Sequence, residues 1–284
     1  MRKYFLILLF PSIVVWGSAE ISAPFFWGPY EKGTVKFEKA SILLAVKGEE
    51  ERYIQLDTGS DSSYAYGESE RKSFSLASRD EREFIHTFNP KPEISGDKII
   101  GTLGADFFTN KCLLIDFPRE TISISDCEKE KLDQKFVWIH GSRSNFGHLL
   151  IDVVVGEHVI KNVMFDTGSS IFSLAVKEDD WKKIVVERAI EHPTHSIVVP
   201  SWGKLLTMIG ADPKMPVCIQ SICTSKPVYI LPKEFGLENY GISGTIGNAL
   251  FYDTHVLVMD FKENKLGLAP SKELRVRQPN KRLW

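Results

Sequence analysis

The sequence predicts an all-β protein made of two homologous, barrel-like lobes with a cleft between them. From Thr34 onward, short apolar runs alternate with turn residues, which is typical of an all-β domain. The tetrapeptide Asp-Thr-Gly-Ser occurs twice, at residues 57–60 and 166–169, and each copy follows an apolar strand. The residues around the two copies also repeat, so the chain contains a duplicated supersecondary unit.

The repeat extends well beyond the tetrapeptide. A single Asp at the end of a strand is usually a turn residue, whereas two copies in matched surroundings indicate a shared role. The alternative, in which both Asp residues only cap turns, leaves the rest of the repeat unexplained. The matched segments are 42–48 with 149–156, 99–104 (Ile-Ile-Gly-Thr-Leu-Gly) with 242–247 (Ile-Ser-Gly-Thr-Ile-Gly), Phe108 with Phe251, and 115–117 (Ile-Asp-Phe) with 259–261 (Met-Asp-Phe).

These residues resemble the aspartic peptidases, the clan of pepsin-like and retropepsin-like enzymes. The marks of that clan are Asp-Thr-Gly followed by Ser, Thr or Ala, and later in each lobe two apolar residues and a Gly. The first lobe has Ile99-Ile100-Gly101 for the second mark, and the second lobe has Ile242-Ser243-Gly244, where Ser243 departs from the apolar pattern. The resemblance covers roughly residues 33 to 270.

The resemblance implies the pepsin-like acid protease fold and an aspartic-type endopeptidase, a hydrolase that cleaves polypeptides. It assigns catalysis to Asp57 and Asp166. It also implies that Thr58 and Thr167 link the two active-site loops across the lobe interface. The residues expected to support the loops are Thr58, Gly59, Ser60, Thr167, Gly168 and Ser169.

The residue types suit this chemistry on physical grounds. Peptide hydrolysis needs an activated water and a proton for the leaving nitrogen. Two carboxylates a few ångströms apart cannot both ionise easily, so they share one proton and titrate as a pair. Each Gly permits a tight loop in which backbone amides approach the carboxylate. We expect the hydroxyls of Ser60 and Ser169 to donate hydrogen bonds to the two carboxylates.

Composition and the N-terminus indicate an exported protein. Apolar residues make up 43% and charged residues 25% of the chain, and the net charge of −2 does not favour a nucleic-acid partner. Residues 1–19 predict a cleaved signal peptide, with an uncleaved anchor as the alternative. We expect lobes at 20–130 and 131–284 with a charged linker at 126–134, no lasting membrane span, and a monomer that is secreted, periplasmic or lumenal.

The four cysteines of an exported chain suggest two disulfides, for which three pairings exist. Sequence position favours Cys112 with Cys127, because a two-residue turn at Arg119-Glu120 would place them opposite each other in a hairpin. It also favours Cys218 with Cys223, which would close a small loop. Buried free thiols are the alternative.

The elements can be predicted in order along the chain. Residues 22–33 are expected to line an edge or to pack as an irregular arm, and strands are expected at 34–37, 41–46 and 53–56. The polar stretch 67–98 is expected to carry a mobile flap over bound peptide, with Phe74 or Phe84 at its tip. The second lobe is predicted to have a helix at 178–191, ended by His192-Pro193, strands at 196–199 and 227–231, and, by resemblance, a closing hairpin at 260–270.

Several features depart from the pepsin-like pattern. The segment from Asp57 to Gly101 is short, Asp61 is closer to the retropepsin pattern, and a long propeptide is not expected. No cofactor or metal is expected, and His192 and His195 are interpreted as loop residues rather than a zinc pair. The alternative function is a catalytically inactive, peptidase-like protein that binds peptides or inhibits other enzymes; an intact pair of Asp residues argues against it.

Overall fold

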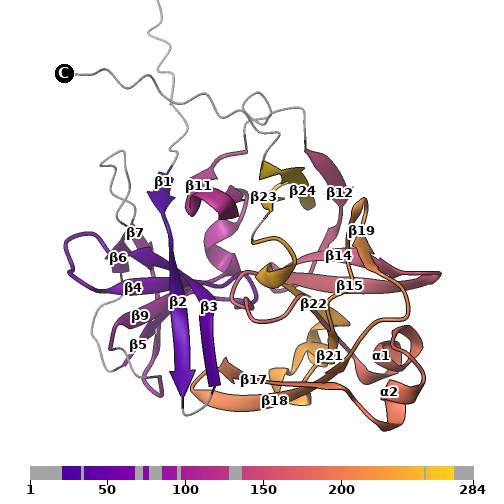
Figure 1. The fold of residues 1–284 in the computed structure, drawn as a ribbon. Coiled ribbons are helices and arrows are strands. Elements are labelled where there is room, and N and C mark those ends of the chain that lie inside the picture. Colours follow the sequence, from indigo (N-terminus) through magenta and orange to yellow (C-terminus); the bar gives the residue numbers. More distant parts are fainter. Residues whose placement is uncertain are drawn as a thin grey trace, which may run out of the picture.

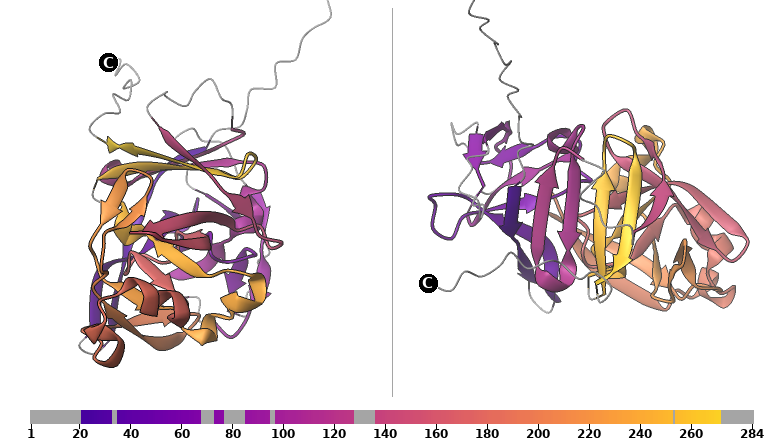
Figure 2. Two further views of the ribbon diagram at one scale, coloured as in Figure 1. Left: turned by 90° about the vertical axis from the view of Figure 1, so that its right-hand side faces the viewer. Right: turned by 90° about the horizontal axis from the view of Figure 1, so that it is seen from above.

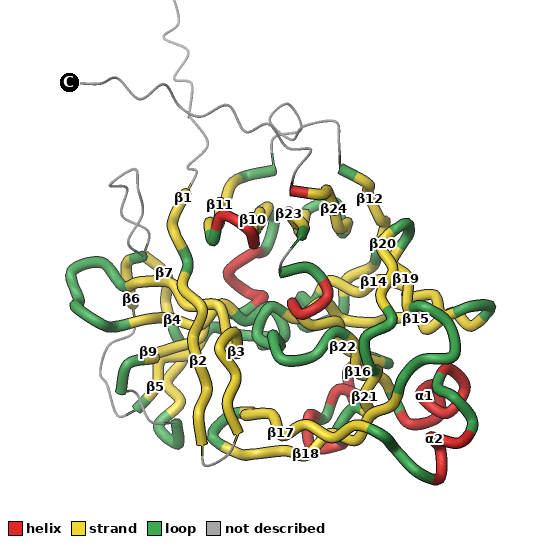
Figure 3. Tube along the Cα trace, viewed as in Figure 1, coloured by secondary structure: helices red, strands yellow, loops and turns green. Residues whose placement is uncertain are grey.

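The computed structural model of the protein describes residues 21–32, 35–67, 73–76, 85–94, 97–127, 136–252 and 254–271. Within these ranges the chain is mostly β-structure, as the sequence predicts, with short helical segments between strands (Figures 1 and 3). We call residues 21–127 the first half and residues 136–271 the second half. The predicted signal peptide and most of the predicted linker lie outside the described residues, so the lobe boundary stays a prediction.

The two halves share one strand arrangement, so the duplicated sequence folds into a duplicated topology. In each half five strands lie side by side, and from the first to the fifth the neighbouring pairs are antiparallel, parallel, antiparallel and parallel. In the first half the order is β3 (Val35–Ala45), β4 (Tyr53–Leu56), β9 (Ile99–Leu103), β5 (Tyr64–Tyr66) and β8 (Asn89–Lys91). In the second half it is β14 (Leu149–Val155), β15 (His158–Asp166), β22 (Gly244–Gly247), β16 (Leu174–Val176) and β21 (Val228–Ile230).

Further strands extend these two sheets, and one small ribbon stands apart from them. In the first half β2 (Phe26–Lys32) pairs with β3, and β6 (Ser73–Ser75) pairs with β7 (Ile85–Thr87) as a separate ribbon. In the second half the additional strands are β13 (Ser142–Arg143), β17 (His195–Ser201), β18 (Lys204–Ala211), β19 (Val217–Ile219) and β20 (Ile222–Thr224).

A third sheet joins the halves. Its order is β1 (Ile21–Pro24), β11 (Thr121–Ser125), β10 (Cys112–Asp116), β23 (His255–Asp260), β24 (Lys265–Pro270) and β12 (Val137–His140). At its centre β10 of the first half lies antiparallel to β23 of the second, with Leu114 opposite Val258. The view from above in Figure 2 shows the two hairpins side by side. Beneath the sheet, Phe108 stacks on Phe261 at 5.5 Å between ring centres, so one hydrophobic core spans both halves.

The helical elements are short. The helix predicted at 178–191 is two helices, α1 (Glu178–Ile184) and α2 (Arg188–Glu191), separated by Val185 in an extended conformation. Val185 forms a β-bridge with Pro213, and this tertiary pairing interrupts the helix that local periodicity favours. The 3₁₀ helices are η1 (Ala105–Phe108), η2 (Phe117–Arg119), η3 (Lys233–Phe235), η4 (Leu237–Tyr240) and η5 (Asn248–Leu250).

Of the two alternatives for residues 22–33, the irregular arm was wrong, because the described residues form most of β1 and β2. The segment does line edges, since β1 and β2 are outer strands of their sheets. Ile21, Ala23 and Phe25 are buried, an alternation with period two that the Pro and Gly residues obscure in the sequence. The strand predicted at 53–56 is confirmed, whereas those predicted at 34–37 and 41–46 are one long strand, β3. The hairpin expected at 260–270 is β23 with β24.

Both predicted disulfides are present, Cys112–Cys127 and Cys218–Cys223. The predicted register of the first was wrong: Cys112 lies opposite Ser125, because η2 and Glu120 form a longer turn than the predicted two-residue one. Cys127 follows the strand with a positive φ of 39° and so reaches back to Cys112. Cys218 lies directly opposite Cys223 in the β19–β20 hairpin.

Candidate active site

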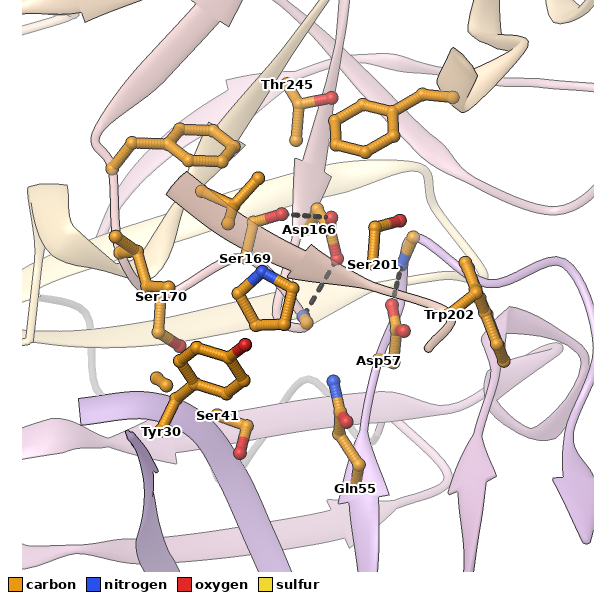
Figure 4. Close-up of a pocket in the computed structure, with 18 of the residues that line it drawn as sticks. Tyr30, Ser41, Gln55, Asp57, Asp166, Ser169, Ser170, Ser201, Trp202 and Thr245 are labelled. Atoms are coloured by element: carbon orange, nitrogen blue, oxygen red, sulfur yellow. Dashed lines mark hydrogen bonds between the residues drawn. The ribbon is translucent and has the colours of Figure 1, made fainter. Parts of the chain in front are cut away.

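Each Asp of the duplicated tetrapeptide lies where a strand ends beside a parallel neighbour. Asp57 follows β4, and its backbone N–H donates to the Leu103 carbonyl of β9 at 3.0 Å. Asp166 is the last residue of β15 and lies opposite Gly247 of β22. Because the same parallel pair is repeated in both halves, the two loops project toward each other between the halves (Figure 4).

The glycines of the two loops pack against the opposite carboxyl groups. A Cβ atom placed on Gly59 would lie 2.4 Å from Cγ of Asp166, and one placed on Gly168 would lie 2.4 Å from Cγ of Asp57. Neither position tolerates a side chain, since real Cβ contacts do not come this close. Glycine at these two positions therefore allows the carboxyl groups to approach each other.

The threonines join the loops through reciprocal hydrogen bonds. The Thr58 N–H donates to Oγ1 of Thr167 at 2.9 Å, and the Thr167 N–H donates to Oγ1 of Thr58 at 3.1 Å. Oγ1 of Thr58 in turn donates to the Phe165 carbonyl at 3.0 Å. Both threonines are buried, so water does not compete for these bonds. The link between loops that the resemblance implied is therefore present in the structure.

The two carboxyl groups differ in their hydrogen-bond donors. Oδ1 of Asp57 accepts from the N–H groups of Gly59 and Ser60, both at 3.1 Å. Oδ1 of Asp166 accepts from the Gly168 N–H at 2.8 Å, and Oδ2 accepts from the Ser169 hydroxyl at 2.6 Å. The expectation for Ser60 was wrong, because its hydroxyl donates to the Ser62 carbonyl at 2.7 Å instead.

Burial raises the pKa of Asp57 well above its ordinary value, and the charge of Asp166 and a hydrogen bond between the two carboxyl groups raise it further. The backbone N–H groups of Ser60 and Gly59 act in the opposite direction. The pair can therefore retain a proton at a pH where an isolated carboxyl group is ionised.

Different residues support the two loops from behind. In the second half the side-chain amide of Asn248 donates to the Thr167 carbonyl and to Oγ of Ser170, both at 2.7 Å. In the first half the hydroxyl of Ser63 accepts from the Gly104 N–H at 3.0 Å and donates to Asp106 at 2.7 Å. The backbones of the two loops match, but the side-chain hydrogen bonds that support them differ between the halves.

A cavity of about 550 Å³ opens over the two carboxyl groups. Its first-half wall comes from the β2–β3 hairpin and from Gln55 and Tyr66, and its second-half wall is largely apolar (Figure 4). The residues of the second-half wall include Met164, Ile171, Phe172, Val199, Phe235 and Leu237. A cavity of this size, lined mainly by apolar groups around two acids, suits one stretch of an extended peptide.

Of the two residues predicted at the flap tip, the structure describes only Phe74, whereas Ile94 of the predicted flap segment lines the cavity. Phe74 is buried and packs edge-on against Phe88 at 4.7 Å between ring centres, so it belongs to the core. Phe84 lies outside the described residues. The polar composition of 67–98 suggested a surface segment, but it did not reveal that Phe74 anchors the β6–β7 ribbon to the first half.

Three residues near the site were not singled out from the sequence. Tyr66 lines the cavity and shares a short hydrogen bond with Thr102, and burial raises its pKa. Trp202 lines the cavity at the tip of the β17–β18 hairpin, which two strand-like runs separated by Trp-Gly could have signalled. His148 is buried, its Nδ1 lies 3.0 Å from the Ser144 hydroxyl, and burial lowers its pKa.

The described part of the chain contains one cluster of side chains close enough together to hold a metal ion. The group of possible metal ligands found there is Cys112, Cys127 and Asp260, and its two cysteines are bonded to each other. No helix in the described ranges has the length and apolar character needed to cross a membrane.

Comparisons with known proteins add little. No family model matches the chain, and no curated protein matches it. Among solved structures the chain is similar to basic 7S globulin from soybean, with 8% sequence identity and a TM-score of 0.45 over 89% of this chain and 97% of that chain. A similarity this distant carries no argument about activity.

Proposed function

We propose that this protein is an aspartic endopeptidase with two pepsin-like lobes, which hydrolyses polypeptides in the cleft between its halves. The observation that carries the proposal is the interlocking of two duplicated loops, in which each glycine packs on the opposite carboxyl group. Turn caps would not need this contact. The disulfides fit the export that the N-terminal sequence predicts.

The proposed mechanism assigns different roles to the two acids. Asp57 holds the shared proton, because burial and the neighbouring charge raise its pKa. Asp166 is assigned the role of base, and the Ser169 hydroxyl and the Gly168 N–H donate to its oxygens and orient the carboxyl group. Asp166 takes a proton from the attacking water while Asp57 gives its proton to the carbonyl oxygen. The new hydroxyl then returns that proton to Asp57, the C–N bond breaks, and Asp166 protonates the leaving nitrogen.

The test uses the protein without residues 1–19 and a dye-quenched peptide library at several pH values. We expect a bell-shaped pH profile on the acid side of neutrality, because the active pair is singly ionised. Asp57→Asn and Asp166→Asn should each lower kcat by roughly 10²–10⁴-fold or more. The double variant should be no worse than either single one, since the pair acts as a unit.

Asp152→Asn is the matched control, because Asp152 is an exposed carboxylate on β14 away from the cleft. Circular dichroism would check that each variant is folded. A statine-type peptide should bind the wild type and lose affinity in the two active-site variants. A folded Asp166→Asn variant that keeps substantial activity would overturn the paired mechanism. Peptide binding without cleavage by the wild type would favour the alternative of an inactive peptide-binding protein.

A further inference from the structure

The β17–β18 hairpin extends from the second half toward the first half (Figure 1). Its base belongs to the second-half sheet, where Gly210 of β18 lies opposite Tyr229 of β21. Its strands pair from His195–Gly210 to Ser201–Lys204, which leaves only Trp202 and Gly203 in the turn. The hairpin is therefore a paired ribbon with one aromatic side chain at its tip.

The tip contacts the opposite wall of the cleft. The Trp202 ring packs edge-on against Tyr64 at 5.7 Å and against Tyr66 at 6.4 Å between ring centres. Nζ of Lys91 lies 3.9 Å from the centre of the same ring, within the range of a cation–π interaction. All three partners belong to β5 and β8 of the first half, so Trp202 bridges the two halves.

The backbone of the turn favours a different residue at position 202. Trp202 has a φ of 47° and Gly203 a φ of 78°, so both residues occupy the left-handed region. Two-residue turns of this kind favour Asn-Gly, and a bulky residue at positive φ is uncommon. Strained residues of this type cluster at ligand clamps and switch regions. A tryptophan here costs local strain, and what offsets that strain is its contact with Tyr64, Tyr66 and Lys91.

The same hairpin tip faces the two acids. Ser201, Trp202 and Gly203 line the cavity together with Asp57 and Asp166 (Figure 4). A hairpin joined to both walls restricts the entry of a polypeptide from that side. Trp202 is 39% exposed, so its contact can open without unpacking a core.

We infer that the β17–β18 hairpin of the second half is the cover of the cleft, and that Trp202 is a positioning residue that holds it against the first half while an extended peptide is bound. This inference rests on the proposed function, which identifies the bound ligand as a polypeptide. It assigns the covering role to the second half, whereas the sequence pattern pointed to residues 67–98. Lids of this type exclude water and complete a site when closed.

The kinetic test compares Trp202→Ala with two matched variants. Trp202→Ala should lower kcat/KM for an eight-residue peptide by about tenfold, mainly through KM, because peptide escapes from the open cleft. The limbs of the pH profile should not move, because the two acids are untouched. Trp202→Phe keeps a ring and should restore most of the loss. Ile209→Ala removes a similarly exposed apolar side chain from β18, away from the tip, and should match the wild type.

A second readout does not require activity. Backbone amides of residues 195–204 should exchange hydrogen at least several-fold faster in Trp202→Ala than in wild type, with no peptide present. Tyr64→Ala should have a smaller effect, because Tyr66 and Lys91 still contact the Trp202 ring. Combining it with Trp202→Ala should add little, since Trp202→Ala already removes the contact with Tyr64. Unchanged exchange in Trp202→Ala would overturn the inference. If the wild type cleaves no peptide but amide exchange is still faster in Trp202→Ala than in the wild type, the result would count against the proposed function alone.

Discussion

Ser60 and Ser169 occupy the same place in two identical tetrapeptides, yet their hydroxyl groups form different hydrogen bonds. The Ser169 hydroxyl donates to Asp166, whereas the Ser60 hydroxyl donates to the carbonyl of Ser62. The difference arises because the chain after Ser60 turns its Ser62 carbonyl toward the hydroxyl. Such an asymmetry gives the two acids unequal environments, which a working acid–base pair requires.

We therefore predict unequal effects on the pH profile when each serine is replaced. A hydroxyl that donates to a carboxylate favours its ionised form, so its loss raises the pKa of the pair's lower titration. Ser169→Ala should move the acid limb of kcat/KM to higher pH by roughly one unit, as expected for one charge-assisted hydrogen bond. Ser60→Ala should move it less. Equal shifts in both variants, measured on one peptide across the acid range, would contradict this asymmetry.

At the scale of elements, the loop of the second Asp-Thr-Gly-Ser, residues 166–169, depends on one buried side chain, that of Asn248. Asn248→Ala would leave the Thr167 carbonyl and the Ser170 hydroxyl without the donor they now share. We expect a loss of about 1–3 kcal/mol in the free energy of unfolding, since both groups stay buried. Asn89→Ala, at an exposed position on β8, should change it by less than about 0.5 kcal/mol. Urea unfolding of the three proteins at one pH would measure the difference.

The elements that the sequence predicted are those specified by local pattern or by repetition. The strands that lead into Asp57 and Asp166 follow from their apolar runs, and the Cys218–Cys223 pairing follows from close spacing. The Cys112–Cys127 pairing was right although the register predicted for it was wrong. The interruption of the helix at Val185 could not be predicted, because its cause is a bridge to Pro213. The packing of Phe74 on Phe88 and the contact of Trp202 with Tyr64 likewise depend on residues distant in the chain. Local pattern thus predicted the two acids, but not the contact of the β17–β18 hairpin with the first half.

For the whole molecule, the raised pKa of Asp57 predicts a pH-dependent stability. Protonation of Asp57 favours the folded state, so its stabilising contribution is complete below about pH 4, the ordinary pKa of Asp, and is lost as the pH rises through the folded-state value. An Asn side chain at position 57 cannot ionise, so the Asp57→Asn variant does not lose this stability as the pH rises. Its free energy of unfolding, relative to wild type, should therefore rise as the pH increases from about 4 through the folded-state pKa of Asp57.

Urea unfolding between about pH 3.5 and pH 8, with the disulfides intact, would measure this difference. Asp152→Asn, which changes an exposed carboxylate on β14, is the control. A constant difference between Asp57→Asn and wild type over that range would show that Asp57 does not retain its proton in the folded protein.

The sheet shared by the two halves has a consequence for how the chain reaches its structure. β10 pairs with β11 along the chain, but its other neighbour is β23, which lies much later in the sequence. Until β10 and β23 pair, a folded first half would present β10 as an open edge, and open edges pair readily with other chains. Pairings between such distant segments also make folding slow. The β23–β24 hairpin is therefore expected to close this edge late in folding, with aggregation competing until then.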